Sequence, residues 1–138
     1  MKELQLNQVE EFTVDAINPW CETGIFLRAS HTYMFDVPNN QTWKDGDSLG
    51  DIPADGINRW YLTGLHPSLR MPFVKWYALL GCISRNRPYF KIGSHKENFV
   101  PEEDGELICF ANDSLWFGGH FYEHNNSGSL KVKVTRTQ

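Results

Sequence analysis

The C-terminal part of the sequence carries the residues best suited to bind a cation. The segment FANDSLWFGGHFYEHNNSGSLKVKV places Asp113 directly after one strand-like run, and Asn125 and Asn126 directly before another. A carboxylate and two amide oxygens at neighbouring strand ends are hard ligands of the kind that Ca²⁺ prefers. The same residue types also make ordinary turns, so a calcium site and simple turn chemistry both remain open.

A second pattern in this segment concerns zinc. Residues 120–124 (HFYEH) have the H-x-x-E-H spacing of inverted zinc peptidases, in which a helix places both histidines on one face. Gly118 and Gly119 precede the pattern and the turn sequence NNSG follows it, so the sequence predicts a loop without room for that helix. No third ligand is indicated downstream, and we expect exposed His and Glu side chains rather than catalytic zinc.

Other catalytic or cation-binding patterns are missing. The acidic segment KDGDSLGDIPADG does not fit the EF-hand loop, because Leu49 and Gly56 occupy its fifth and twelfth positions, and its four aspartates are expected to be turn residues. The sequence contains no G-x-S-x-G elbow, no phosphate-binding loop and no dinucleotide-binding glycine pattern. These observations favour a binding protein over an enzyme.

Composition excludes several classes of partner. The 138 residues carry a net charge of −4 and no cluster of Lys and Arg, so nucleic acid is not expected as a partner. No apolar run approaches the roughly 20 residues that span a bilayer, and the N-terminus has no signal-peptide pattern, so we expect a protein without membrane insertion that starts in the cytoplasm. Cys21, Cys82 and Cys109 stand in apolar surroundings, as buried free thiols do.

The elements that must position these residues are strands. Seven short segments rich in β-branched and aromatic residues predict strands at 9–17, 23–30, 31–37, 73–84, 88–93, 105–112 and 129–135. In the last segment Leu130, Val132 and Val134 alternate with polar residues, which indicates a half-buried antiparallel strand. Helical periodicity is not found for more than two turns. The sequence therefore predicts one all-β domain over 1–138, an antiparallel β-sandwich or jelly roll.

Two stretches, 36–72 and 112–128, interrupt the predicted strands. Loops of this length are uncommon in compact domains unless they serve a function. Aromatic residues in or near them could stack on the apolar face of a sugar, or could simply close the ends of the sandwich. These residues are Trp43, Trp60, Trp116, Phe117 and Tyr122.

The C-terminal segment resembles the Pseudomonas-type calcium-dependent galactose-binding lectins, which are galactose-binding-domain-like β-sandwiches. The resemblance is carried mainly by Asn112-Asp113 and by the run NNSGS from Asn125 to Ser129. Further matches in chain order are WCETGIFL (20–27), Trp43, His66-Pro67 and the KIG of 91–93. The loop between Asp113 and Asn125 is several residues longer than in the family.

The resemblance implies a calcium-dependent lectin. The ion would be held by Asp113, by the side chains of Asn125 and Asn126, and by carbonyls of Trp43 and of the 114–124 loop, while two sugar hydroxyls complete its shell. His66 and Trp116 would shape the sugar site. It further implies a carbohydrate partner of galactose type, a homo-oligomer, and export without a signal peptide. The alternative is a calcium-independent protein-interaction or assembly domain on the same scaffold.

Overall fold

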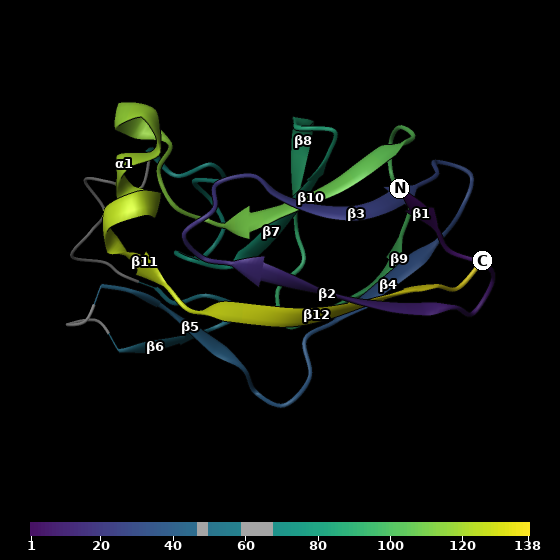
Figure 1. The fold of residues 1–138 in the computed structure, drawn as a ribbon, viewed down its shortest axis with the longest axis horizontal. Coiled ribbons are helices and arrows are strands. Elements are labelled where there is room, and N and C mark those ends of the chain that lie inside the picture. Colours follow the sequence, from purple (N-terminus) through teal and green to yellow (C-terminus); the bar gives the residue numbers. More distant parts are fainter. Residues whose placement is uncertain (47–49, 59–67) are drawn as a thin grey trace.

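The structure is a computed structural model that describes residues 1–46, 50–58 and 68–138, without the side chains of residues 116–120. Most of the described chain is in strands, and one helix follows the tenth strand (Figure 1). The elements are β1 (Lys2–Glu3), β2 (Val9–Asp15), β3 (Cys21–Leu27), β4 (Tyr33–Asp36), β5 (Thr42–Asp45), β6 (Asp51–Pro53), β7 (Leu79–Ile83), β8 (Asn86–Lys91), β9 (His95–Phe99), β10 (Gly105–Ala111), α1 (Trp116–Asn125), β11 (Asn126–Ser127) and β12 (Ser129–Arg136).

The strands form a sandwich of two larger sheets with a smaller sheet at one end. The five-stranded sheet has the order β1-β3-β10-β7-β8, the four-stranded sheet β2-β12-β4-β9, and the small sheet β11-β5-β6. Every pair of strands is antiparallel except β1 and β3. The small sheet and α1 lie at the end of the sandwich opposite the two chain termini (Figure 1). The predicted all-β, antiparallel β-sandwich is confirmed.

The core lies between the two larger sheets and follows the apolar pattern of the sequence. All five residues of β7 are buried, and so are six of the seven in β10, which makes these the best-covered strands of their sheet. In β12 the alternation is as predicted, since Leu130, Val132 and Val134 are buried and the lysines between them are exposed. The three cysteines are buried free thiols, as their apolar surroundings indicated.

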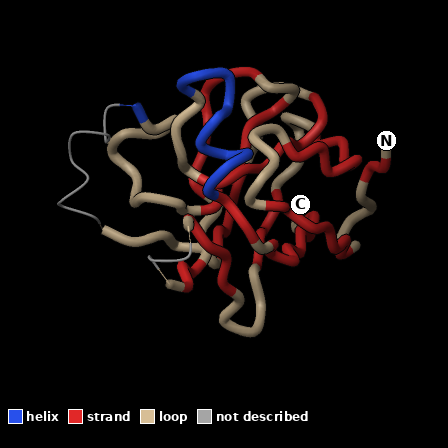
Figure 2. Tube along the Cα trace, turned by 60° about the vertical axis from the view of Figure 1, so that its left-hand side comes forward, coloured by secondary structure: helices blue, strands red, loops and turns tan. Residues whose placement is uncertain are grey.

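Each of the seven predicted strand segments overlaps a strand, but both predicted loops contain more structure than expected. The stretch 36–72 includes the β5–β6 hairpin, and the stretch 112–128 includes α1 and β11. The expectation of a loop over 120–124 was wrong, because these residues lie within the ten-residue helix α1. Figure 2 shows this helix beside the strands at its end of the molecule. The two glycines disfavour a helix, but tertiary contacts of Tyr122, described below, override that propensity.

No helix among the described residues is long and apolar enough to cross a membrane.

Candidate functional site

The candidate site is built around Asp113, the second residue after β10. The side chain is almost completely buried, with 2% of its surface exposed. Its Oδ1 accepts a hydrogen bond from the backbone N–H of Ser114 at 2.8 Å. Its Oδ2 is buried without a hydrogen-bond partner in the described part of the chain. A buried carboxylate oxygen without a donor is costly, so this oxygen is positioned for a ligand that supplies positive charge.

Asn126 brings a second such oxygen to the same end of the sandwich. It belongs to β11 and pairs with Asp45 of β5 across the small sheet. Its Nδ2 donates to the carbonyl of Ala16 at 2.9 Å, which fixes the amide, whereas its buried Oδ1 has no partner among the described residues. The Asn126 side chain also lies close enough to Asp113 to favour the charged form of that carboxylate. Two oxygens without hydrogen-bond partners, one from the segment after β10 and one from β11, therefore lie near each other.

The electrostatics of Asp113 reflect its burial. Burial raises the pKa of this carboxyl from its ordinary value to about 7, and the nearby Asp45 carboxylate raises it further. The hydrogen bond from the Ser114 N–H and the nearby Asn126 side chain lower the pKa but do not cancel the shift. Near pH 7 the carboxyl is thus partly protonated, and its ionised form lacks a compensating charge. A bound cation would supply the compensating positive charge.

Asn112 holds the loop that precedes β7 against this site. Its Nδ2 donates to the carbonyls of Met71, Val74 and Lys75 at 3.0–3.1 Å, and its Oδ1 accepts from the Met71 N–H at 3.0 Å. The amide is completely buried and uses both its donor and its acceptor capacity. The two residues of the Asn112-Asp113 motif therefore have different roles. Asn112 organises the neighbouring loop, while Asp113 presents a carboxylate.

The helix α1 connects Asp113 to the two asparagines and is anchored by Tyr122. The Tyr122 hydroxyl donates to the carbonyl of Ala111 and accepts a hydrogen bond from Arg70 Nη1 at 3.3 Å. The buried Arg70 guanidinium stacks on the ring of Phe110, with its carbon 3.2 Å from the ring centroid, and also donates to the carbonyl of Pro19. These contacts fix the segment whose two ends carry the candidate ligands.

Asn125 and Trp43 lie at the same end as Asp113 and Asn126. Asn125 is the last residue of α1, its side chain is exposed, and its carbonyl accepts the N–H of Gly46 at 2.6 Å. Trp43 is buried, and its Nε1 donates to the carbonyl of Tyr77 at 3.1 Å. Its backbone packs against Gly128, the glycine of the NNSG turn. The side chain of Trp43 thus belongs to the core, which leaves only its carbonyl as a candidate ligand.

Two predicted ligand residues are not tested by this geometry. His66 lies outside the described residues. Trp116 is the first residue of α1, but its side chain is among those not described. Of the other aromatic residues considered for sugar stacking, Tyr122 is completely buried and packs within the domain. Tyr122 therefore agrees with the alternative in which these aromatic residues close the end of the sandwich and do not contact a sugar.

Asp45 was expected to be one of four turn aspartates, but it lies in a strand. Asp45 is 7% exposed, ends β5 and accepts a hydrogen bond from Trp76 Nε1 at 2.7 Å. The available signal was the alternation in TWKD, which places Asp45 on the same buried face as Trp43. By contrast, Asp55 behaves as predicted for a turn acid, because it accepts hydrogen bonds from Ser94 N and Oγ at 2.8 and 2.7 Å.

The zinc pattern of residues 120–124 is helical, contrary to the predicted loop, yet Glu123 and His124 are exposed at the surface. Across the described residues, no group of three or more His, Cys, Asp and Glu side chains could hold a metal ion. The candidate cation site is therefore of another type, in which amide and carbonyl oxygens supplement the carboxylates.

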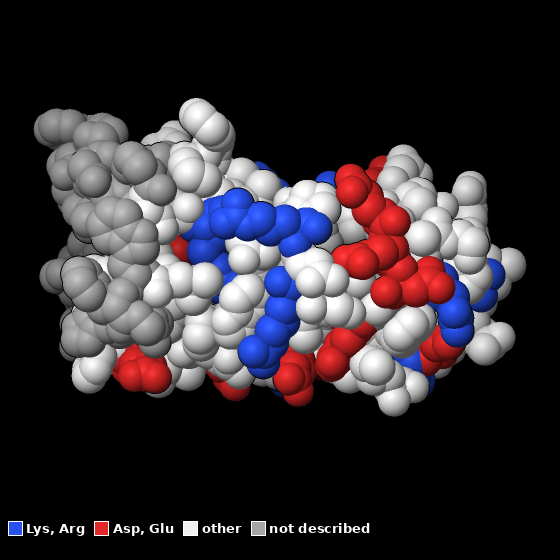
Figure 3. Space-filling model, turned by 90° about the horizontal axis from the view of Figure 1, so that it is seen from above, with Lys and Arg blue, Asp and Glu red and all other residues white. Residues whose placement is uncertain are grey.

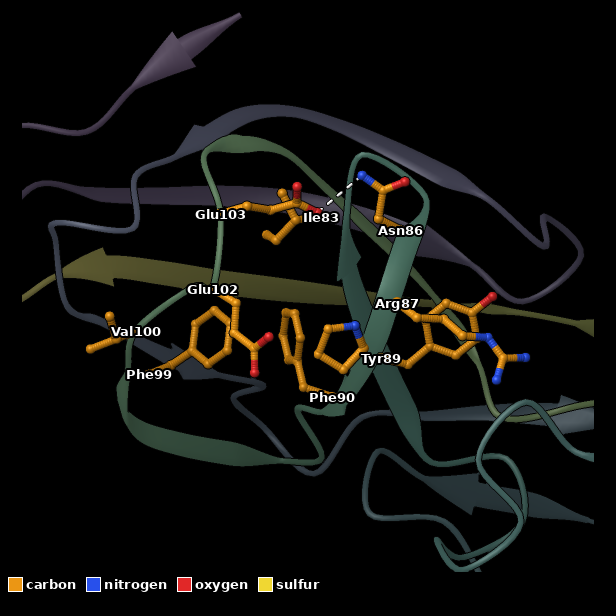
Figure 4. Close-up of a pocket in the computed structure, with 10 residues that line it drawn as sticks. Ile83, Asn86, Arg87, Tyr89, Phe90, Phe99, Val100, Glu102 and Glu103 are labelled. Carbon is orange, nitrogen blue, oxygen red and sulfur yellow. Dashed lines mark hydrogen bonds between the residues drawn. The ribbon is translucent and has the colours of Figure 1, made fainter.

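A separate hollow of about 470 Å³ lies beside β8, and Figure 4 shows its lining. The rings of Phe90 and Phe99 pack with centroids 4.1 Å apart, and Asn86 donates to Glu103 at 3.0 Å. A second hollow of about 490 Å³ includes Phe73, whose side chain is fully exposed. Neither hollow includes any of the candidate ligands.

The charged side chains are mixed on the face shown in Figure 3, where acidic groups gather toward the right-hand end and basic groups lie nearer the middle. Apart from the grey atoms, this face carries no broad basic patch.

The fold is similar to that of a lectin domain. The solved structure described as "EclA N-terminal domain; PllA-like lectin" superimposes with a TM-score of 0.63 and 20% sequence identity. The match covers 91% of this chain and 94% of that one. No protein-family model and no curated protein matches the sequence. The structural likeness establishes a lectin-like β-sandwich over most of the chain.

Proposed function

We propose that this chain is a carbohydrate-binding module in which a calcium ion holds the hydroxyls of a sugar. The observation that carries the proposal is the pair of buried, unpartnered oxygens, Asp113 Oδ2 and Asn126 Oδ1, at one end of a lectin-like sandwich. Carboxylate and amide oxygens form the donor set that Ca²⁺ prefers. The described side chains therefore fit the ion that the family resemblance implies.

Asp113, after the end of β10, and Asn126, in β11, would hold the ion. Asn125 would add an amide at the solvent side, where its side chain is exposed. Carbonyls of Trp43 and of the 114–124 segment complete the proposed set. A bound calcium ion would supply coordination positions for two neighbouring sugar hydroxyls. The chain itself fixes the ligands, through the bond of Asn126 to Ala16 and the anchoring of α1 by Tyr122.

Thermal unfolding tests this proposal directly. The protein is stripped with EDTA and melted alone, with millimolar Ca²⁺, and with Ca²⁺ plus galactose. A ligand at 100 times its dissociation constant stabilises the native state by about 2.7 kcal/mol, so we expect a shift of several degrees with Ca²⁺ and a further shift with sugar.

The matched variants for this test are Asp113→Asn and Asp36→Asn. Both remove one carboxylate, but Asp36 has a half-exposed side chain on β4 and is not a proposed ligand. The first variant should lose the calcium shift and the second should keep it. Equal calcium shifts in the wild type and Asp113→Asn would contradict the proposed site.

A second candidate function is a protein-interaction domain that needs no calcium. The fully exposed ring of Phe73 and the half-exposed Val100 each line one of the two hollows, where a partner could cover them. Both hollows include residues 87–89 of β8. Light scattering across a concentration series would show an oligomer that is unchanged by EDTA and weakened by Phe73→Ser. A monomer at all concentrations would exclude self-association through this surface.

A further inference from the structure

The hollow of about 490 Å³ that includes Phe73 has two walls. One wall is formed by residues 70–74 of the loop before β7, and the other by residues 87–89 of β8. The first wall is held in place by the buried amide of Asn112, which bonds to the backbone of Met71 and Val74. The hollow is therefore preformed, and its described lining contains none of the proposed calcium ligands.

Arg70 places a positive charge in the first wall. This residue is 7% exposed, and its Nε and Nη2 are buried without a hydrogen-bond partner among the described residues. The bonds of its Nη1 go to two neutral groups, the carbonyl of Pro19 and the hydroxyl of Tyr122. No Asp or Glu in the described part of the chain forms an ion pair with this guanidinium. A buried charge is normally paired, because it has lost its hydration.

Aromatic rings compensate the charge of Arg70 only in part. Its guanidinium carbon lies 3.2 Å from the ring centroid of Phe110 and 4.0 Å from that of Trp20. The face of a ring attracts a cation, but it offers neither a negative charge nor a lone pair to the two N–H groups without partners. Because these groups are buried, Arg70 would act on a ligand in the hollow through its charge and not through direct contact.

Arg87 supplies exposed donors in the second wall. Arg87 and Tyr89 are two positions apart in β8 and therefore share a face of the strand, and the guanidinium carbon lies 5.3 Å from the Tyr89 ring centroid. Figure 4 shows both side chains extending away from Phe90 and Phe99. Arg87 is exposed and forms no ion pair with any described carboxylate. Its planar fork of N–H donors fits two oxygens of a carboxylate or sulfate group.

The remaining lining of the hollow is apolar. It consists of Met71, Pro72, Phe73, Val74, Pro88 and the ring of Tyr89. Such a surface accepts the apolar face of a sugar ring, and a volume of about 490 Å³ suits a small molecule better than an extended polypeptide. The hollow thus combines positive charge with an apolar platform, which is the complement of a small oxyanion that has an apolar face.

We infer that this hollow is a second binding site, which takes an acidic saccharide without calcium. The carboxylate or sulfate group of the saccharide binds to Arg87 in the field of Arg70, and the sugar ring lies on Tyr89. The choice of a saccharide rests on the proposed function. The anion site itself goes beyond that function, because it needs no metal ion and lies apart from the candidate calcium ligands.

The test is an NMR titration of the whole protein in EDTA, with galacturonic acid, a sulfated galactose and galactose as probes. In the wild type we expect the better acidic sugar to bind about tenfold more tightly than galactose, because a hydrogen-bonded ion pair with Arg87 is added. The backbone amides of the two walls should show the largest shifts. Arg87→Gln, at an exposed position, should lose about that tenfold preference.

The matched control is Arg85→Gln. It removes a guanidinium from the same hairpin, but Arg85 pairs with the exposed Glu22 at 3.4 Å and does not line the hollow. Affinity for the acidic sugars should change by less than about twofold in this variant, because an exposed ion pair contributes little.

Equal affinities for the acidic sugars and galactose would overturn the inference, and so would wild-type affinity in Arg87→Gln. Tighter binding of inorganic sulfate or of a tetraglutamate peptide than of either acidic sugar would overturn the assignment to a saccharide. Because calcium is absent from the titration, none of these results bears on the proposed calcium site. Conversely, a missing calcium shift in thermal unfolding would leave the outcome of the titration unchanged.

Discussion

Arg70 donates from Nη1 to the hydroxyl of Tyr122 at 3.3 Å, and through this bond a buried guanidinium holds the helix that joins the candidate ligands. The same hydroxyl donates to the carbonyl of Ala111 at the end of β10. The helix itself has no side-chain hydrogen bond at its N-terminus and contains two glycines. Its position therefore depends on tertiary contacts rather than on intrinsic helix propensity.

We expect Tyr122→Phe to lower the free energy of unfolding by about 1–2 kcal/mol, because it removes the buried hydrogen bond to the Ala111 carbonyl and the acceptor for Arg70. Denaturant unfolding with unchanged m-value measures the loss. Tyr89→Phe is the control, since Tyr89 is only partly buried. If the two variants lose equal stability, the Tyr122 hydroxyl does not anchor α1.

Asn112→Ala should lower the free energy of unfolding by more, about 2–4 kcal/mol, because it removes the four hydrogen bonds that this buried amide makes to the preceding loop. Hydrogen exchange should accelerate at Met71, whose N–H bonds to the Asn112 oxygen. Asn126→Ala serves as the comparison, because among the described residues its side chain donates only one hydrogen bond, to Ala16. A smaller loss in Asn112→Ala than in Asn126→Ala would contradict the organising role of Asn112.

The fold was predictable because the burial of each strand determines the pattern of apolar residues in its sequence. The alternation of Leu130, Val132 and Val134 follows from one buried and one exposed face, and β7 and β10 are apolar runs because both of their faces are covered. The sequence of the helix α1 shows no comparable apolar pattern. Gly118 and Gly119 weaken its propensity, and the contact that secures it joins Tyr122 to Arg70, 52 residues away in sequence.

The candidate site was predictable only in part, for a related reason. Asp113 and Asn126 stand at strand ends whose positions the sequence indicates, so their oxygens could be expected near one another. Asp45 looked like a turn residue within an acidic segment, because nothing local shows that β11 would pair with β5 beside it. The Asp45–Trp76 bond is likewise a tertiary contact, and tertiary contacts are not encoded in local patterns.

Gly128→Ala should weaken cation binding through the backbone of Trp43. Gly128 has a φ of +83°, and an added Cβ would lie 3.3 Å from the Cα of Trp43. Gly24→Ala is the matched control, because Gly24 has a φ of +74° with open space around it. In both variants the free energy of unfolding should fall by about 1–2 kcal/mol, because alanine disfavours the left-handed backbone conformation. Only Gly128→Ala should lose Ca²⁺ affinity in titration, and equal affinities would argue against the Trp43 carbonyl as a ligand.

The pH dependence of the metal-free protein provides a test that needs no ligand. The pKa of Asp113 is raised to about 7 in the folded state, above the ordinary value of 3.8 that applies when the chain is unfolded. The folded protein therefore binds the proton more tightly than the unfolded chain does, and the stabilisation is fully present below about pH 4. It is lost as the pH rises toward about 7, because each deprotonated molecule must then hold a buried charge.

We therefore compare the free energies of unfolding of the wild type and Asp113→Asn in EDTA. Relative to the variant, the wild type should become less stable from about pH 4 to about pH 7, and the difference should level off above pH 7. Asparagine does not titrate, so the difference removes the contributions of all other groups that behave alike in both proteins. Saturating Ca²⁺ should abolish the trend in the wild type, because the cation compensates the carboxylate. A difference that does not vary with pH would mean that Asp113 is ionised throughout this range. The charge argument for a cation at this position would then fail.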